Sequence, residues 1–427
     1  MARRRTHTHV HLPTAALALA LTATACGAVA GDGPVADPLV VWIMEGTNPD
    51  ETAYFDAANS AFTERTGVEV EVEFVPWSDA QNKISTAIAG DTVPDVVELG
   101  TTFIPEFADS GALYDLSTHI DDPYLYTQSM LRMGQIDDRI YGVPWYAAIR
   151  SIVYRSDLFE EHGQEVPQDW AELRETAVAL SEAEEDMTAF PVPGDAQYSV
   201  MPWIWGGGGE LAAQRPDGTW VSDIDSEGGR AGMSFFTGLA LEDGVSTTGA
   251  VNWNEIDVME ALAEERAVMA ISGSATPKAI LESNPDLEGR LGAFPIPGRE
   301  GGYTDSFAGG SLLSVFAGTG QEETAWEYVA HLTGDEFSIR WSEETGFFPG
   351  RAAAVRTFAE SENPLVRPFA VQLEAASRGT PVTPAWGRVE AAKVIVAMQQ
   401  DVLNGDATVE EATEHAADEV ERILNGD

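Results

Sequence analysis

Short apolar runs and helical patterns alternate through the first hundred residues. Residues 39–44 form a continuous apolar run, typical of a strand buried on both faces, and residues 94–99 contain a second one. Between them, residues 68–74 alternate between apolar side chains and glutamate, which predicts a strand with one solvent-exposed face. Helical patterns fill the gaps between these strands. The order strand, helix, strand, helix, strand predicts right-handed crossovers and a mostly parallel sheet.

The two helical patterns carry start and stop signals. The first begins at Asn48-Pro49, has an acid three residues after the cap, and ends at Gly67. Ser78 begins the second helix, whose Ile84 and Ile88 are expected to point inward. The apolar face of the first helix consists of Tyr54, Phe55, Ala58 and Phe62.

The rest of the chain continues these patterns with more interruptions. A turn is predicted at 141–145, before an apolar run at 149–154, and Gly, Pro and Trp are frequent through 190–300. Four consecutive glycines at 206–209 lie beside Trp203 and Trp205. The other predicted elements are strands at 267–271 and 311–316, helices at 167–183 and 322–332, breaks at 294–298, 307–310 and 346–350, and a final helix with a capping box formed by Thr408 and Glu411.

The first 26 residues are typical of an export signal. Three arginines at 3–5 precede an apolar stretch at 15–25, which is shorter than the roughly 20 residues that span a bilayer. Cys26 follows directly, as in a bacterial lipoprotein signal, whose cysteine is acylated and becomes the mature N-terminus. Ala23 stands where that signal usually has leucine, so secretion without an anchor is the alternative. We therefore expect a signal peptide at 1–25 and a flexible tether at 26–37.

Composition narrows the class of protein. The 427 residues include 24 Lys and Arg against 70 Asp and Glu, a net charge of −46. Such a surface repels phosphate backbones, so we expect no nucleic-acid binding. With 44% hydrophobic residues the chain can build a large core, and its length suggests two lobes. A single cysteine forms no internal disulfide, so the stability of the fold must come from that core.

Motifs for catalysis or metal binding are absent from the sequence. There is no P-loop, no H-E-x-x-H, no C-x-x-C and no G-x-S-x-G, and the four histidines after the signal are far apart. Residues 223–228 resemble the start of a calcium loop, but position twelve would be Ser234, so we interpret them as a turn in which Ser226 caps a helix. We expect no cofactor and no metal. A pair of carboxylates for glycoside hydrolysis remains an alternative, because the sequence has 70 acids and no pattern singles out a pair.

Four stretches, in this order and spacing, resemble one family, the extracellular solute-binding proteins of ATP-driven carbohydrate importers, which include maltose- and trehalose-binding proteins. The four stretches are 94–97, 141–159, 265–270 and 295–310. The tether, the cysteine and the Arg-rich, Lys-poor usage are similar to those of such proteins from high-GC Gram-positive bacteria. Residues 44–50 together with 75–79 resemble the actinobacterial chitooligosaccharide-binding branch.

The resemblance implies an α/β fold of two lobes, like a Venus flytrap, joined by three hinge crossings. The ligand would lie in the cleft between the lobes, which close by hinge motion. Carried onto this sequence, the crossings fall at 147–151, 291–295 and 344–348, lobe one at 38–147 plus 294–344, and lobe two at 148–292 plus 346–427.

A sugar site needs aromatic rings against the C–H faces of the pyranose and planar polar groups for its hydroxyls. Parallel strands bind ligands at their carboxyl ends, here 45–48, 76–77 and 98–102, and the resemblance adds Tyr146 and a glycine pair whose amides face the sugar. Arg150 either faces the ligand or pairs with an acid near the hinge. The expected ligand-binding residues are Glu45, Asn48, Trp77, Glu98, Thr101, Trp145, Tyr146, Trp203, Trp205, Trp253, Ser274, Phe307, Gly309, Gly310 and Arg351.

Three positions depart from the maltose and trehalose relatives. Ala148 and Gly100 stand where those relatives carry acids, and Gly273-Ser274 replaces a tryptophan. These departures argue against unchanged maltose specificity.

We therefore expect a monomer, lipid-anchored at the extracellular face of the cytoplasmic membrane, that catalyses nothing. It would capture a neutral oligosaccharide with high affinity and deliver it to the transmembrane subunits of an ABC permease. A disaccharide of β-1,4-linked N-acetylglucosamine, N,N′-diacetylchitobiose, is expected first, and α-glucosides or xylo- and cello-oligosaccharides next. The alternatives are a secreted glycoside-active enzyme, or the same fold binding a non-sugar solute.

Overall fold

The computed structural model describes residues 37–46 and 51–426, apart from the side chain of Ser78. The predictions for Cys26, for the tether and for Asn48 lie outside these described residues. Within them, no helix combines the length and the apolar character needed to cross a membrane.

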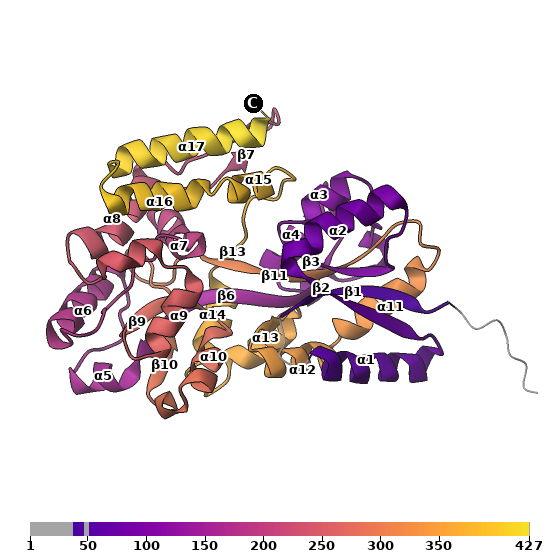
Figure 1. Ribbon diagram of the computed structural model, residues 1–427, viewed down its shortest axis with the longest axis horizontal. Coiled ribbons are helices and arrows are strands. Elements are labelled where there is room, and N and C mark those ends of the chain that lie inside the picture. The colour runs from indigo at the N-terminus through magenta and orange to yellow at the C-terminus, as the bar shows by residue number, and fades with distance from the viewer. Residues whose placement is uncertain (1–36, 47–50, 427) are drawn as a thin grey trace, which may run out of the picture. The chain divides into compact units, whose positions relative to one another are not determined.

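A nine-stranded mixed sheet runs through the described part of the chain, in the order β10-β6-β11-β3-β1-β2, with β9 and β12 also paired to β6 and β13 to β11 (Figure 1). Two short hairpins, β4–β5 and β7–β8, lie outside it. The strands are β1 Leu39–Glu45, β2 Val70–Pro76, β3 Val96–Gly100, β4 Gln135–Ile136, β5 Arg139–Ile140, β6 Val143–Arg155, β7 Ala213–Gln214, β8 Trp220–Val221, β9 Met269–Gly273, β10 Leu291–Phe294, β11 Ser306–Val315, β12 Phe348–Pro349 and β13 Ser377–Arg378.

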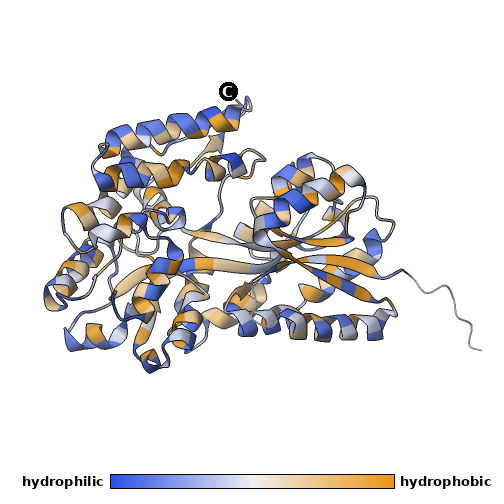
Figure 2. Cartoon of the chain, viewed as in Figure 1, coloured by the Kyte–Doolittle hydropathy of each residue, from blue (hydrophilic) through white to orange (hydrophobic). Residues whose placement is uncertain are grey.

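Helices cover both faces of this sheet. In Figure 2 the sheet strands are mostly hydrophobic, whereas α1 and α17 alternate between polar and apolar residues along their length. The α-helices are α1 Glu51–Thr66, α2 Trp77–Gly90, α3 Ile104–Asp109, α4 Gln128–Met133, α5 Ser156–Glu161, α6 Trp170–Ala183, α7 Gln197–Gly207, α8 Glu227–Leu241, α9 Glu255–Ala263, α10 Thr276–Ser283, α11 Glu322–Leu332, α12 Asp335–Thr345, α13 Ala352–Ala359, α14 Arg367–Ala375, α15 Trp386–Ala391, α16 Val394–Asn404 and α17 Val409–Asn425. Four 3₁₀ turns complete them: η1 Ser117–His119, η2 Pro123–Leu125, η3 Thr248–Asn252 and η4 Pro285–Leu287.

The N-terminal strands and helices confirm the alternation predicted from the pattern. β1 pairs in parallel with β2 and with β3, and the four apolar residues expected to face inward from α1 are buried. Gly67 adopts a left-handed φ of 77° directly after α1, where its missing Cβ lets the helix end. The side chains along β2 alternate in exposure, as the Val-Glu alternation requires.

Beyond these three strands, the prediction of a mostly parallel sheet is wrong. β11 pairs antiparallel with β3 and with β6, and β6 pairs antiparallel with β9, β10 and β12. The sequence pattern missed this because strand direction depends on how the chain returns to the sheet, not on the residues within the strand.

Two predicted breaks lie inside long strands. Residues 143–145 belong to β6 rather than to a turn, and residues 307–310 belong to β11. Gly310 has a φ of 138°, and a Cβ there would lie 2.3 Å from the carbonyl oxygen of Tyr146 on the neighbouring strand. The glycine therefore serves a close approach of two strands instead of a turn.

β6 and β11 connect two hydrophobic cores. The first half of β6 pairs with β11, and its second half pairs with β9 and β10. One of these cores gathers residues of β1, α1, α11 and α12, and the other gathers residues of α6, α7, α8, α16 and α17. A third core gathers residues of α2, α9 and α14 and of β6 and β11 themselves. The chain thus has the two-lobed α/β organisation that was expected.

The second crossing between the lobes lies later than the predicted 291–295. β10 still pairs with the second half of β6, and the Thr304 hydroxyl donates to the carbonyl of Pro202 in α7. The chain passes between the lobes in β11, so residues 294–305 stay with lobe two. The third crossing stays a prediction at 344–348, where Gly346 ends α12 and β12 then pairs with residues 146–147 of β6.

Candidate ligand-binding site

A row of polar and aromatic side chains lies on one face of β6 and β11. Residues opposite one another in an antiparallel pair point to the same face, and alternate residues along a strand share that face. Gly309 pairs with Ala148 and Ser311 with Tyr146. The row therefore consists of Tyr146, Ala148, Arg150, Phe307, Gly309 and Ser311.

At the lobe-two end of this row, Tyr198 covers Phe307. The two rings are stacked, with centroids 4.0 Å apart and an angle of 10° between their planes. The guanidinium carbon of Arg150 lies 4.5 Å from the Tyr198 ring centre and 5.0 Å from that of Phe307. Both distances are within the range of cation–π attraction. Tyr198 enters the site because α7 begins one residue before it.

Arg150 is also held by a carboxylate. Its Nε and Nη2 donate to both oxygens of Glu255, at distances of 2.7–3.0 Å. Glu255 is the first residue of α9, where the Asn254 capping box fixes the helix start and a negative charge is favoured. The structure thus selects the second of the two roles considered for Arg150, an ion pair near the hinge.

A cavity of about 340 Å³ opens beside this ion pair, at the start of α7 and of α9. Its acidic and basic lining residues are Asp195, Glu255, Glu390 and Lys393, and Tyr198 also lines it. The Tyr198 hydroxyl donates to Glu390 at 3.2 Å. Burial and the nearby Glu390 carboxylate raise the pKa of Tyr198, so the phenol stays protonated and serves as a hydrogen-bond donor.

At the lobe-one end, Glu98 joins three strands of the sheet. It accepts hydrogen bonds from the Met44 amide of β1 at 2.8 Å and from the Tyr146 hydroxyl of β6 at 2.9 Å. The Ser311 hydroxyl of β11 in turn donates to the Tyr146 oxygen at 2.9 Å. Burial raises the pKa of Glu98 to about 7, against the lowering effect of these hydrogen bonds.

Glu98 has no exposed surface, so the expectation that it touches the ligand is wrong in this structure. It positions its neighbours instead. Tyr146 is also almost fully buried, stacked on Phe347 with ring centroids 5.0 Å apart. The hydrogen bond between Tyr146 and Glu98 ties the hinge strand β6 to the end of β3 in lobe one.

The carboxyl ends of β2 and β3 reach the same row. The Thr101 amide donates to the Gly310 carbonyl at 3.3 Å, and Gly310 lies three residues, about 10 Å, along β11 from Phe307. The Trp77 ring lies over Gly100, where a Cβ would be 3.4 Å from it, and Trp77 is 37% exposed. The structure therefore places Thr101 beside Gly310, and Trp77 over Gly100, which pairs with Ser311 at the lobe-one end of the row. Glu45 is exposed at the end of β1.

Two of the expected aromatic plates are core residues. Trp145 and Trp203 have no exposed surface, so the prediction that they face a ligand is wrong. Trp145 packs on Trp341, with centroids 4.3 Å apart, and Trp203 stacks on Phe236 at 5.8 Å. Trp42 and Trp170 are also buried, and Trp326 is partly buried.

The glycine run at 206–209 makes room for a neighbouring helix, whereas it was expected to make room for a ligand. A Cβ on Gly207 would lie 2.1 Å from the Gly228 carbonyl oxygen, and one on Gly232 would lie 1.9 Å from that of Trp203. These glycines let α7 and α8 touch backbone to backbone, rather than letting a ligand approach. Trp205 is almost fully buried beneath the Arg378 guanidinium, 5.6 Å from its ring centre.

The remaining expected residues lie outside the row. The Trp253 ring is partly buried, with the Arg266 guanidinium 5.7 Å from its centre. Ser274 lines a separate cavity of about 550 Å³ that is also lined by α10, α12 and α13. Arg351 contacts Asp335 at 3.4 Å and lies over Tyr126, 5.4 Å from its ring centre.

The cations near the row are paired with acids. Arg378 forms ion pairs with Glu210 and with Asp305, the latter at 2.8 Å, and Lys393 pairs with Asp195 at 3.0 Å. Sequence inspection missed Tyr198, Glu255 and Glu390. Tyr198 could have been considered from the sequence, because it lies a few residues before Trp203 and Trp205, which were expected to bind the ligand.

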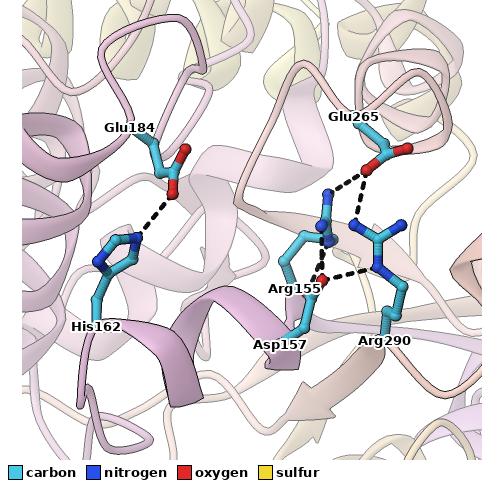
Figure 3. A network of polar contacts seen from close by, with 6 residues as sticks. All are labelled: Arg155, Asp157, His162, Glu184, Glu265 and Arg290. Carbon is cyan, nitrogen blue, oxygen red and sulfur yellow. Dashed lines mark hydrogen bonds and ion pairs between the residues drawn. The ribbon is translucent and has the colours of Figure 1, made fainter.

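A second charged cluster lies at the far end of β6, five residues or about 16 Å along the strand from Arg150 (Figure 3). Asp157 accepts from Arg155 at 2.7 and 2.8 Å and from Arg290 at 2.7 Å, and Glu265 accepts from both arginines at 2.9 Å. This cluster joins β6, α5 and the segments before β9 and β10. Within the described residues no group of three or more His, Cys, Asp or Glu is arranged to hold a metal ion.

Comparisons with known proteins agree with this architecture. Residues 46–337 match the family model described as bacterial extracellular solute-binding protein. The chain is 26% identical to the diacetylchitobiose binding protein DasA of Streptomyces coelicolor over 84% of this chain and 83% of that protein. It is also 26% identical to a galactooligosaccharide-binding protein of Bacillus subtilis, over 73% of this chain and 72% of that protein.

Solved structures show the same fold. The sugar-binding protein MalE of Xanthomonas citri superimposes with a TM-score of 0.81 at 24% identity, over 91% of this chain and 98% of that one. The GacH receptor of Streptomyces glaucescens superimposes with a TM-score of 0.75 at 21% identity, over 91% and 98%. At these identities, the similarity is one of fold.

Proposed function

Because the chain belongs to the bacterial extracellular solute-binding protein family, we propose that it captures an oligosaccharide outside the cell and delivers it to an ABC-type permease. The observation that carries this proposal is the row on β6 and β11, together with Tyr198 at one end and Trp77 at the other. It combines aromatic rings, paired charges and buried hydroxyls on the strands that connect the two lobes. Hinge closure over this row would enclose a ligand.

The chemistry of the row suits a sugar. Tyr198 supplies aromatic surface, stacked over the buried ring of Phe307, and Trp77 offers a further ring at the strand ends. Carboxylates and the Tyr198 hydroxyl supply the few oriented polar groups that fix a ligand in a mostly apolar site. Sugar hydroxyls both donate and accept hydrogen bonds, so they can bond to carboxylates and to cationic side chains that are already paired with one another.

We infer that the ligand is a neutral disaccharide, with N,N′-diacetylchitobiose as the first candidate. The relative from Streptomyces coelicolor, whose name gives this sugar, aligns over 84% of the chain. The Bacillus subtilis relative, named for galactooligosaccharides, makes these sugars the next class to test. The departures at Ala148, Gly100 and Gly273-Ser274 count against maltose.

We further propose that the protein catalyses nothing and works as a monomer. A glycoside-active enzyme needs two carboxylates free to act on the glycosidic bond. Here Glu98 is enclosed by three strands, and Glu255 is bound by Arg150 in both of its oxygens. Turnover of chromogenic β-glycosides, abolished by Glu390→Gln, would favour the enzyme instead.

The anchor is a separate proposal. We infer from residues 1–26 that Cys26 is acylated and holds the protein at the outer face of the cytoplasmic membrane. Expression of the full chain in an actinobacterial host should give a membrane-bound protein, and Cys26→Ser should release or fail to mature it. Equal release of both forms into the medium would contradict lipidation.

Isothermal titration of the mature protein with a sugar panel tests the main proposal. The panel contains N,N′-diacetylchitobiose, cellobiose, xylobiose, lactose and maltose. We expect at least one dissociation constant of about 1 μM or tighter, a binding free energy of roughly −8 kcal/mol. The same sugar at a hundredfold excess over that constant should stabilise the fold by about 2.7 kcal/mol. Absence of binding across the panel would overturn the carbohydrate assignment.

A further inference from the structure

The Arg150–Glu255 pair is placed where it decides which ligand charges the site accepts. The Arg150 side chain is only 10% exposed, whereas Glu255 is 46% exposed and lines the cavity beside Tyr198. Both Glu255 oxygens are bonded to the Nε and Nη2 edge of the guanidinium. Glu255 therefore stands between Arg150 and the cavity, on the edge that a carboxylate binds in bidentate fashion.

Among the described residues, the other cations near the row are also paired with acids. Lys393 in the same cavity pairs with Asp195, and Arg378 pairs with Glu210 and Asp305. Glu390 adds a further acid, hydrogen-bonded by Tyr198 and Trp386. An anionic ligand would meet a net negative wall, whereas a neutral sugar would disturb none of these pairs.

We propose that Glu255 is a specificity-determining residue, which excludes anionic glycans by occupying the guanidinium edge of Arg150 that a ligand carboxylate would otherwise take. The inference rests on the proposed oligosaccharide function, and it names the substrate class as neutral glycans and excludes uronate-containing ones. Glu255 then selects the charge of the ligand, in addition to linking α9 to β6 through Arg150.

The same geometry predicts how the preference changes. Removing the Glu255 charge leaves Arg150 unpaired beside the cavity, with its bidentate edge free for a carboxylate. Removing the Arg150 charge leaves Glu255 unpaired, so the site should favour a cationic sugar. Removing both charges should produce neither preference relative to wild type, because the loss of one positive and one negative charge leaves the net charge around the cavity unchanged.

Titration of four proteins with three disaccharides tests this. The probes are N,N′-diacetylchitobiose, its free-amine form chitobiose, and the β-1,4-linked disaccharide of N-acetylglucosamine and glucuronate, in which glucuronate replaces one N-acetylglucosamine. The proteins are wild type, Glu255→Gln, Arg150→Gln and the double variant. Glu255→Gln should raise the affinity for the anionic disaccharide, relative to the neutral one, about tenfold or more. Arg150→Gln should raise the relative affinity for chitobiose by a similar factor, and the double variant should do neither.

Glu265→Gln is the matched control. It removes the same charge from lobe two, at the far cluster of Figure 3, where Arg155 keeps Asp157 as a partner. Its charge preference should equal that of wild type. A Glu255→Gln protein that folds but behaves like Glu265→Gln overturns the inference. If Glu255→Gln does not fold, the Arg150→Gln ratio decides. A wild type that binds none of the neutral sugars would instead refute the proposed function.

Discussion

The phenol ring of Tyr198 lies parallel to the ring of Phe307, with 4.0 Å between their centroids, although the two residues are 109 positions apart in the sequence. Tyr198 comes from the first turn of α7, and Phe307 from the start of the strand that crosses between the lobes. The pair therefore couples the wall of one lobe to the hinge.

Tyr198→Ala should weaken oligosaccharide binding. Loss of the aromatic contact removes about 1 kcal/mol or more of binding free energy, or about fivefold in affinity. Isothermal titration with the tightest-binding sugar of the panel measures this. Tyr124→Ala is the control, because Tyr124 is 78% exposed on η2 and lies outside the row. Equal affinity in the two variants would show that the row is not the binding face.

Glu98 should make the fold less stable at neutral than at mildly acidic pH. Its pKa in the folded state is raised to about 7, so its contribution is fully present below the unfolded pKa and is lost as the pH rises through about 7. The loss is on the order of 3 kcal/mol. Urea unfolding at pH 5 and pH 8, followed by tryptophan fluorescence, measures the difference.

Glu98→Gln should be less sensitive to pH than wild type over that window, because the amide cannot ionise. Glu71→Gln, an exposed position on β2, removes the same charge and should keep the wild-type pH dependence. An unchanged pH dependence in Glu98→Gln would argue against a raised pKa at this carboxyl.

Asp157→Asn should destabilise lobe two without affecting the ligand. Burial opposes ionisation of this carboxyl, but the hydrogen bonds from Arg155 and Arg290 prevail and lower its pKa to about 2 (Figure 3). Its stabilisation is therefore present above the unfolded pKa of about 4 and is lost as the pH falls towards about 2. The substitution should cost about 1–2 kcal/mol at pH 7, after allowance for solvent screening. Chemical denaturation measures that cost, and a changed sugar affinity would contradict the separation of this cluster from the site.

Gly232→Ala should be severely destabilising. The added Cβ would lie 1.9 Å from the Trp203 carbonyl oxygen, so α7 and α8 would have to separate. Overpacking of this kind costs about 1–3 kcal/mol or more. Gly387→Ala is the matched control, because its Cβ would meet no atom within 4 Å in α15 and alanine favours a helix by about 1 kcal/mol. Thermal unfolding should therefore move in opposite directions for the two variants.

Local patterns predicted many elements closely, because their signals lie within a few residues. The helix expected at 322–332 is α11 with the same bounds, and Ser226 caps α8 by accepting a hydrogen bond from the Gly229 amide. The capping box of Thr408 and Glu411 is also present at α17. Each of these features depends on hydrogen bonds or spacing that the chain carries by itself.

The candidate site was harder to predict, because an aromatic residue beside glycines looks the same whether it meets a ligand or another helix. Trp203 became a core residue since Gly207 and Gly232 bring α7 and α8 into backbone contact. Glu98 was expected at a strand end and lies there, yet three strands enclose it. Phe307 was expected in the site, but its stacking partner Tyr198 was not.

The residues alone determined the alternation of strands and helices in the first hundred residues, several later elements, the acidic composition and the resemblance to binding proteins, because periodicity, capping and charge are properties of the chain. Only the tertiary structure decided which rings line the site and which acid neutralises Arg150. Those outcomes depend on contacts between residues more than a hundred positions apart, and no local pattern reports which of the 70 acids will arrive beside an arginine.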